Sequence, residues 1–243
     1  MRFRLRSPLV GTRPGDGPRG LSRKSAPPRA PRVHGPLSRD VVEDIRATAR
    51  GGRADEAIKL MEEAVAALSR DRPHVAAKAA AQAKSMAPRS GAIREVLGIA
   101  RYREGRFREA LTELQTYRRI TGRLDQNHLI ADSHRALGAP EKAVGVVQEV
   151  LSARIADEVR AEAAVVGGAA LADLGRYEEA LSLLRRFSTK AEMARPHDLR
   201  VWYVTGDVLE RAGRRVEAAK EFRRIVRHDP AAFDAAERLA ALS

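Results

Sequence analysis

Apolar residues recur along most of the chain with the three- and four-residue spacing of one helical face. Leu97, Tyr102, Leu111 and Leu114 illustrate the pattern in one stretch, and Leu171, Leu174, Leu181 and Leu184 repeat it in another. All five prolines after residue 37 fall at or near breaks in the pattern, where a proline can begin or end a helix. The sequence therefore predicts twelve helices, over residues 39–50, 53–69, 73–86, 90–104, 107–120, 124–137, 140–153, 156–174, 177–190, 198–212, 215–228 and 231–241.

A short phrase, a glycine followed five residues later by an alanine, occurs five times between these helices. Its glycines are Gly52, Gly105, Gly138, Gly175 and Gly213, and from Gly105 onward they are spaced by 33, 37 and 38 residues. A glycine can take the left-handed conformation that ends one helix, and the alanine lets the next helix pack closely. Each unit is therefore predicted to be an antiparallel helix pair. The pairing of helix 73–86 stays open, because pairing it with helix 53–69 conflicts with a repeat turn at Gly52.

These units resemble the tetratricopeptide repeat, whose pattern has a Leu-Gly pair early in the first helix, a Gly-x-aromatic turn, an alanine and a closing proline. One unit carries Leu97-Gly98, Gly105-Arg106-Phe107 and Ala110. The unit around Gly138 departs from the pattern. Two further units match at Gly168, Gly175, Tyr177 and Ala180, and at Trp202, Gly206, Gly213, Ala218, Phe222 and Pro230. The resemblance implies an all-α fold, a right-handed superhelical array of antiparallel helix pairs (an α-solenoid) over residues 38–243, in which the last helix caps the array.

Composition agrees with a helical protein and removes several kinds of chemistry. The 243 residues are 44% hydrophobic but only 4% aromatic, and there is no cysteine, which excludes disulfides, thiolate zinc sites and cysteine nucleophiles. The longest uncharged apolar run found near the centre, Ala163–Ala172, is far shorter than the roughly 18 residues of a membrane span. We expect a cytoplasmic protein.

The positive charge is concentrated at the start of the chain. Residues 1–37 hold nine Lys and Arg, one acid and seven of the twelve prolines, so they carry +8 of the net charge of +13. Such a segment is predicted to be a disordered basic arm that folding does not need. Arginine outnumbers lysine 38 to 7, which is typical of a GC-rich bacterial genome of the actinobacterial kind.

No set of residues with catalytic spacing is present in the sequence, and the one stretch with dinucleotide-binding spacing, Gly15-Asp16-Gly17-Pro18-Arg19-Gly20, lacks the preceding strand and the following helix that such a motif needs. His128 and Asp132 share one helical face, but a metal site there would need a third ligand, and none is nearby. The sequence therefore predicts neither an enzyme nor a bound cofactor or metal.

The first helices of the pairs would line the concave groove, which is the usual binding surface of such arrays. Sixteen positions in register on these helices hold six acids against two arginines, which predicts an acidic groove and a protein or peptide partner with basic residues. Charged exposed residues are common on any helix, so an ordinary solvated face is the alternative. The predicted partner-binding residues are Glu95, Ile99, Tyr102, Asp125, His128, Asp132, Arg135, Glu162, Arg200, Tyr203, Asp207 and Glu210.

We therefore expect a non-enzymatic scaffold or adaptor that binds segments of partner proteins. The alternative is a basic repeat protein that associates with RNA or a ribonucleoprotein through residues 1–37 and two arginine-rich turns, around residues 101–123 and 211–227. Glutamates are interspersed among those arginines, which also suits an ordinary salt-bridged surface.

Overall fold

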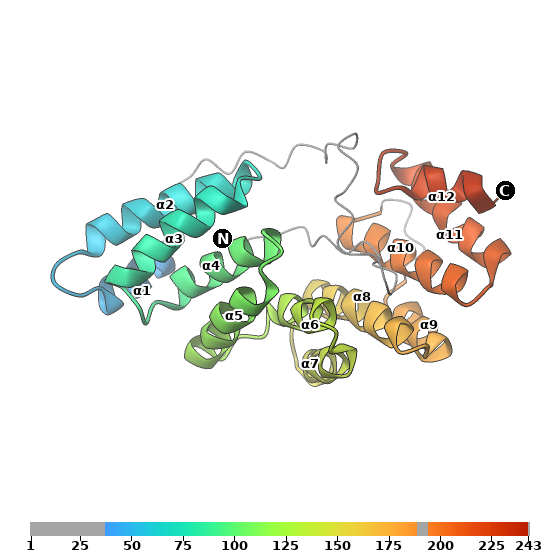
Figure 1. The fold of residues 1–243 in the computed structure, drawn as a ribbon, viewed down its shortest axis with the longest axis horizontal. Helices are drawn as coiled ribbons and strands as arrows, with labels where there is room; N and C mark the ends of the chain where they lie inside the picture. The colour runs from blue at the N-terminus through green and yellow to red at the C-terminus, as the bar shows by residue number, and fades with distance from the viewer. Residues whose placement is uncertain (1–36, 189–193, 243) are drawn as a thin grey trace. The chain divides into compact units, whose positions relative to one another are not determined.

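The computed structural model describes residues 37–188 and 194–242, and these form α-helices without a strand (Figure 1). The predicted basic arm lies, up to residue 36, outside the described residues. Two compact units divide the chain at Leu137 and Gly138, within the repeat that departs most from the family pattern. No helix of the described ranges is long and apolar enough to cross a membrane.

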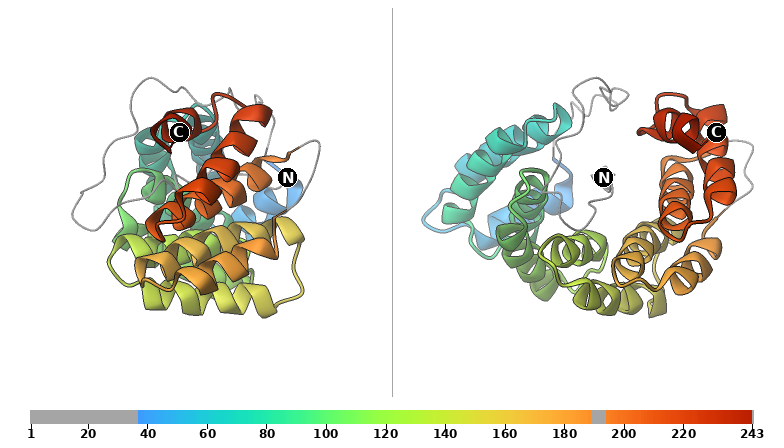
Figure 2. Two further views of the ribbon diagram at one scale, coloured as in Figure 1. Left: turned by 90° about the vertical axis from the view of Figure 1, so that its right-hand side faces the viewer. Right: turned by 45° about the vertical axis from the view of Figure 1, so that its right-hand side comes forward.

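The first unit, residues 37–137, contains two close helix pairs. Helices α2 and α3 form one pair, α4 and α5 form the next, α1 packs on α2 and α4, and α6 packs mainly on α5 (Figures 1 and 2). The bounds are α1 Arg39–Thr48, α2 Ala54–Ser69, α3 Pro73–Met86, α4 Gly91–Arg103, α5 Phe107–Thr121 and α6 Asn127–Ala136.

The second unit, residues 138–242, repeats the arrangement. Helix α7 packs on α8, the pairs α8–α9 and α10–α11 follow, and α12 covers α11. The bounds are α7 Pro140–Ser152, α8 Asp157–Asp173, α9 Tyr177–Arg185, α10 Pro196–Arg211, α11 Arg215–His228 and α12 Ala235–Leu242.

Ten of the twelve helices match the predicted ranges within three residues at each end. The ninth helix ends at Arg185, five residues before its predicted end. The backbone N–H groups of Arg186 and Phe187 donate to carbonyls three residues back, which is the pattern of a 3₁₀ turn and not of an α-helix. The twelfth begins at Ala235, four residues late, after a turn at Phe233 with a positive φ of 57°.

The predicted glycine turns connect three of the pairs. Gly105, Gly175 and Gly213 have φ values of 74°, 74° and 77°. In each turn the next residue, an arginine, donates its backbone N–H to a carbonyl five residues back, at 2.8–2.9 Å. This bond satisfies a carbonyl that the end of the helix leaves free.

The open pairing of the third helix is resolved by a turn that lacks glycine. Asp71 has a φ of 55°, and the backbone N–H of Arg72 donates to the carbonyl of Ala67 at 2.9 Å, as in the glycine turns. Ala76 follows Asp71 by five residues, and Gly105 follows it by 34. Helix α2 thus pairs with α3, and the prediction of a repeat turn at Gly52 was wrong: Gly52 lies in the loop between α1 and α2, which contact each other far less than α2 and α3 do.

Candidate partner-binding stripe on the first helices

The twelve residues predicted to bind a partner lie on the first helices of both units, and we call them the stripe. Asp125 is the exception, since it lies in the turn just before α6. The first unit carries Glu95, Ile99, Tyr102, Asp125, His128, Asp132 and Arg135, and the second carries Glu162, Arg200, Tyr203, Asp207 and Glu210.

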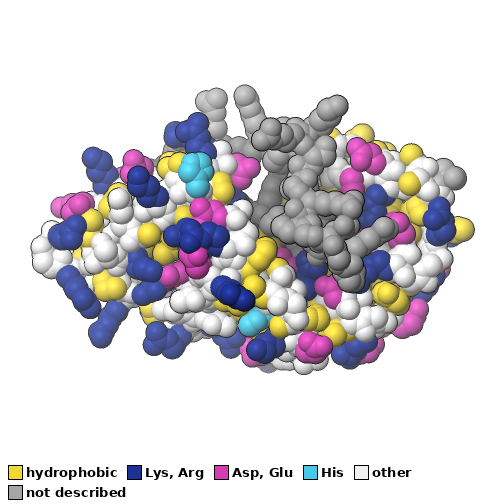
Figure 3. All heavy atoms as spheres, viewed as in Figure 1, with side chains coloured by type: hydrophobic (Ala, Val, Ile, Leu, Met, Phe, Trp, Pro, Cys, Tyr) yellow, Lys and Arg dark blue, Asp and Glu magenta, His cyan; other side chains and the backbone are white. Residues whose placement is uncertain are grey.

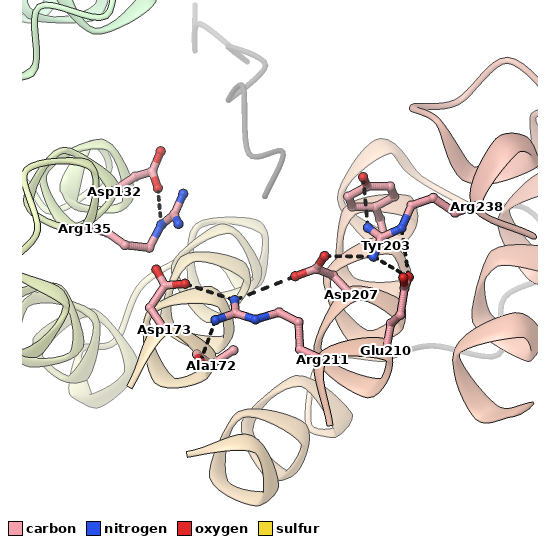
Figure 4. Close-up of polar contacts among 9 residues, drawn as sticks. All are labelled: Asp132, Arg135, Ala172, Asp173, Tyr203, Asp207, Glu210, Arg211 and Arg238. Atoms are coloured by element: carbon pink, nitrogen blue, oxygen red, sulfur yellow. Dashed lines mark hydrogen bonds and ion pairs between the residues drawn. The ribbon is translucent and has the colours of Figure 1, made fainter. Parts of the chain in front are cut away.

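In the first unit, Asp132 joins two first helices. Tyr102 of α4 donates its hydroxyl to Oδ2 of Asp132. Nε of Arg135 donates to Oδ1 of Asp132 at 2.9 Å, as Figure 4 shows. Asp132 is 4% exposed and Tyr102 is 2% exposed. Because the carboxylate is buried with both oxygens bonded, it is part of the framework that holds α4 against α6.

The acids at the start of this stripe are bonded in the same way. Nε2 of Gln126 donates to Oε1 of Glu95 at 2.7 Å, and the hydroxyl of Tyr117 donates to Oδ1 of Asp125 at 2.8 Å. Arg123 pairs with the other oxygen of Asp125. Burial, reinforced by the negative charge of Asp125, raises the pKa of Glu95 above its ordinary value.

Ile99 and His128 are buried, so neither offers an open side chain. The described ranges contain no group of three His, Asp or Glu side chains able to hold a metal ion. Asp132, the predicted neighbour of His128 on the helix, is already bonded to Tyr102 and Arg135.

In the second unit, the ion pair of Glu162 and Arg200 joins two first helices. Both carboxylate oxygens accept from the guanidinium, and Nε of Arg200 lies 3.0 Å from Oε2. The pair ties α8 to α10 and is mostly shielded from solvent.

Arg238, from the last helix, binds three stripe residues at once. Its guanidinium donates to Asp207 at 2.9 Å, to Glu210 at 2.7 Å and to the hydroxyl of Tyr203 at 3.2 Å (Figure 4). The Tyr203 hydroxyl in turn donates to Asp234 at 2.7 Å. Burial alone would lower the pKa of Arg238, but the charge of Asp207 and the contact with Tyr203 outweigh it and raise the pKa.

Arg211 adds a further link between α8 and α10. It donates to Oδ1 of Asp173 at 3.0 Å and to the carbonyl of Ala172 at 2.7 Å, and it lies 3.9 Å from Asp207 (Figure 4).

The predicted acidity of the stripe is therefore largely balanced by neighbouring guanidinium groups. Arg123, Arg211 and Arg238 stand outside the sixteen positions counted from the register, yet they bind its acids. Along the stripe of the second unit, four carboxylates share three arginines and Asp234 accepts from the Tyr203 hydroxyl, which leaves a small local excess of negative charge. The four carboxylates are Glu162, Asp173, Asp207 and Glu210, and the arginines are Arg200, Arg211 and Arg238.

The family model of the tetratricopeptide repeat matches residues 61–123 and 167–235, more than half of the chain. The chain belongs to the tetratricopeptide repeat family, whose fold acts in general as a scaffold for protein interactions. No curated protein matches the sequence.

Solved structures with the same fold differ widely in sequence. The tetratricopeptide repeat protein TTC0263 of Thermus thermophilus is 18% identical with a TM-score of 0.62, and the match covers 76% of this chain and 98% of that one. The quorum sensor NprR of B. thuringiensis is 12% identical with a TM-score of 0.66, over 83% of this chain and 62% of that one. YrrB, described as having an unusual peptide-binding site, is 19% identical with a TM-score of 0.52, over 76% and 91%.

Proposed function

We propose that this protein is a non-enzymatic cytoplasmic scaffold that binds a segment of a partner protein along the stripe. The observation that carries the proposal is the set of side-chain bonds between neighbouring first helices, such as Tyr102 to Asp132 and Arg200 to Glu162. These bonds fix the side chains before a partner arrives, so little conformational entropy is lost when it binds.

The partly exposed members of the stripe supply the contacts. Glu210 and Asp207 retain acceptor sites beyond those used by Arg238, because each carboxylate has about four lone-pair positions. Peptide N–H groups and basic side chains of a partner are suitable donors for them. The small excess of carboxylates in the second unit favours a segment with at least one Lys or Arg. Peptide binding by YrrB, which has the same fold, supports this class of ligand.

A peptide selected from a random twelve-residue display library against the full chain tests the proposal, with affinities measured by calorimetry. Glu210→Gln removes a stripe charge but keeps an acceptor for Arg238, and we expect it to weaken binding about tenfold, or 1.4 kcal/mol. Glu237→Gln, at an exposed position of α12, is the matched control and should change the affinity less than about twofold. Equal effects of the two substitutions would contradict a site on the stripe.

The RNA alternative has less support in the described residues. At three of the repeat turns the arginine is paired with a glutamate three residues on: Arg106 with Glu109, Arg176 with Glu179, and Arg214 with Glu217. A phosphate would have to compete with these carboxylates, which lowers the gain from each contact.

A further inference from the structure

A cleft of about 590 Å³ lies in the first unit, away from the stripe, between α3 and the end of α4 with its turn into α5. One row of α3 forms its long side, with a histidine, a lysine, an amide and a hydroxyl. The other side carries two arginines and one carboxylate. The lining residues are His74, Lys78, Ala81, Gln82, Ser85, Arg101, Glu104 and Arg106.

The side chains that line the cleft include more cations and hydrogen-bond donors than carboxylates. Arg101 binds Glu104 at 2.8 Å and Glu109 at 3.2 Å, so these groups offset one another. Lys78 and His74 make no ion pair with any residue of the described ranges, and both are exposed. Lys84, farther along α3, differs because it is bound to Glu113 at 2.8 Å. Lys78 is thus an unopposed cation on the wall of the cleft.

The row has the length and chemistry to bind an extended chain. His74 and Ser85 are eleven residues apart, which is about 16 Å along a helix. That distance suits about five residues of an extended peptide. The Lys78 ammonium and the Gln82 amide are donors that fit carboxylates and peptide carbonyls, whereas the Ser85 hydroxyl already donates to the carbonyl of Gln82 at 2.7 Å and is left to act as an acceptor.

We propose that this cleft binds an acidic, extended segment of a partner protein, as a second docking site separate from the stripe. Figure 3 shows charges of both signs interspersed on the face it draws, so net surface charge alone selects no site there. The cleft differs because an unpaired lysine and neutral donors stand in one row. The inference goes beyond the proposed function and does not depend on the stripe.

The test uses the full chain and a rhodamine-labelled hexaglutamate peptide, with binding measured by fluorescence anisotropy at low salt. Lys78→Glu should weaken binding about fivefold or more, since an attraction is replaced by a repulsion. Lys59→Glu makes the same charge change at an exposed position of α2 outside the cleft and should have less than about a twofold effect. Lys78→Arg should retain the affinity, and circular dichroism should show all three variants folded.

Equal weakening by Lys78→Glu and Lys59→Glu would overturn the proposal, because it would show attraction to net charge alone. The proposal would also be overturned if hexaglutamate bound none of the proteins, or if Lys78→Glu weakened only a six-nucleotide thymidine strand. Glu210→Gln should leave hexaglutamate binding unchanged, so failure here is distinguishable from failure of the stripe.

Discussion

Gly206 of α10 lies directly against the ring of Phe222 in α11. A Cβ atom added to Gly206 would come within 2.9 Å of Cε1 and Cζ of that ring. The same relationship joins Gly98 to Leu114 and Gly168 to Leu184, in each case sixteen residues apart. The early glycine of the repeat is therefore the point where the first helix of a pair contacts the second.

Gly206→Ala should destabilise the protein by up to about 2 kcal/mol. An alanine gains about 1 kcal/mol of helix propensity, but the aromatic ring cannot move aside without disturbing its buried surroundings, and overpacking costs about 1–3 kcal/mol. Gly145→Ala in α7 is the control, because no atom lies within 4 Å of an added Cβ there. It should raise the free energy of unfolding by about 0.5–1 kcal/mol. Urea denaturation measures the free energy of unfolding of both variants. If both variants are more stable than the wild type, the close contact between Gly206 and Phe222 is contradicted.

Asp71→Gly should stabilise the protein by about 1 kcal/mol. A non-glycine residue in the left-handed conformation costs about 1–2 kcal/mol, and glycine removes most of that cost. The loss of the weak contact between Asp71 and Arg103, 3.8 Å apart with Asp71 80% exposed, matters little. The reverse change, Gly105→Ala, should lower the thermal midpoint. If Asp71→Gly lowers it as well, Asp71 does not act as the turn residue of a repeat.

Glu95→Gln should become more stabilising as the pH rises. The folded protein raises the pKa of Glu95, so the stability that this group contributes is complete below its unfolded pKa of about 4.3 and is lost as the pH rises through the folded value. Glutamine keeps the acceptor for Gln126 and carries no charge to bury. The difference in unfolding free energy between variant and wild type should therefore grow from pH 4 to pH 7. Glu63→Gln, at an exposed position, should show no such trend.

Arg238→Ala should cost about 2–4 kcal/mol, because it leaves Asp207 and Glu210 without their main partner in a mostly shielded place. The guanidinium also lies 4.6 Å from the centroid of the Phe222 ring, so packing is lost as well. Arg223→Ala, at an exposed position of α11, should stay within about 0.5 kcal/mol of the wild type. Equal unfolding free energies for both variants would show that α12 does not hold the end of the second unit.

The helices could be predicted from the sequence because apolar spacing, prolines and glycine turns all indicate the same boundaries. The pairing of α2 with α3 could not be decided from the sequence because its turn uses Asp71, and a search for glycine cannot find a left-handed aspartate. The signal that remained was the spacing, since Ala76 and Gly105 stand at the repeat distances from Asp71.

The charge of the stripe could not be predicted from its register. Asp132 is balanced by Arg135, which is inside the counted positions, but Asp207 and Glu210 are balanced by Arg238, 31 and 28 residues away in sequence. Only the packing of α12 brings that guanidinium to α10. The position of a residue on a helical face follows from local periodicity, whereas its electrostatic partners depend on tertiary contacts.

Hydrogen–deuterium exchange of the full chain, with and without the peptide selected from the display library, tests the central claim most directly. Binding along the stripe should slow amide exchange in the first helices α4, α6, α8 and α10, or in those of one unit, and leave α5, α9 and α11 unchanged. Protection confined to the second helices, or none anywhere with the peptide bound, would contradict the assignment of the stripe as the partner-binding surface.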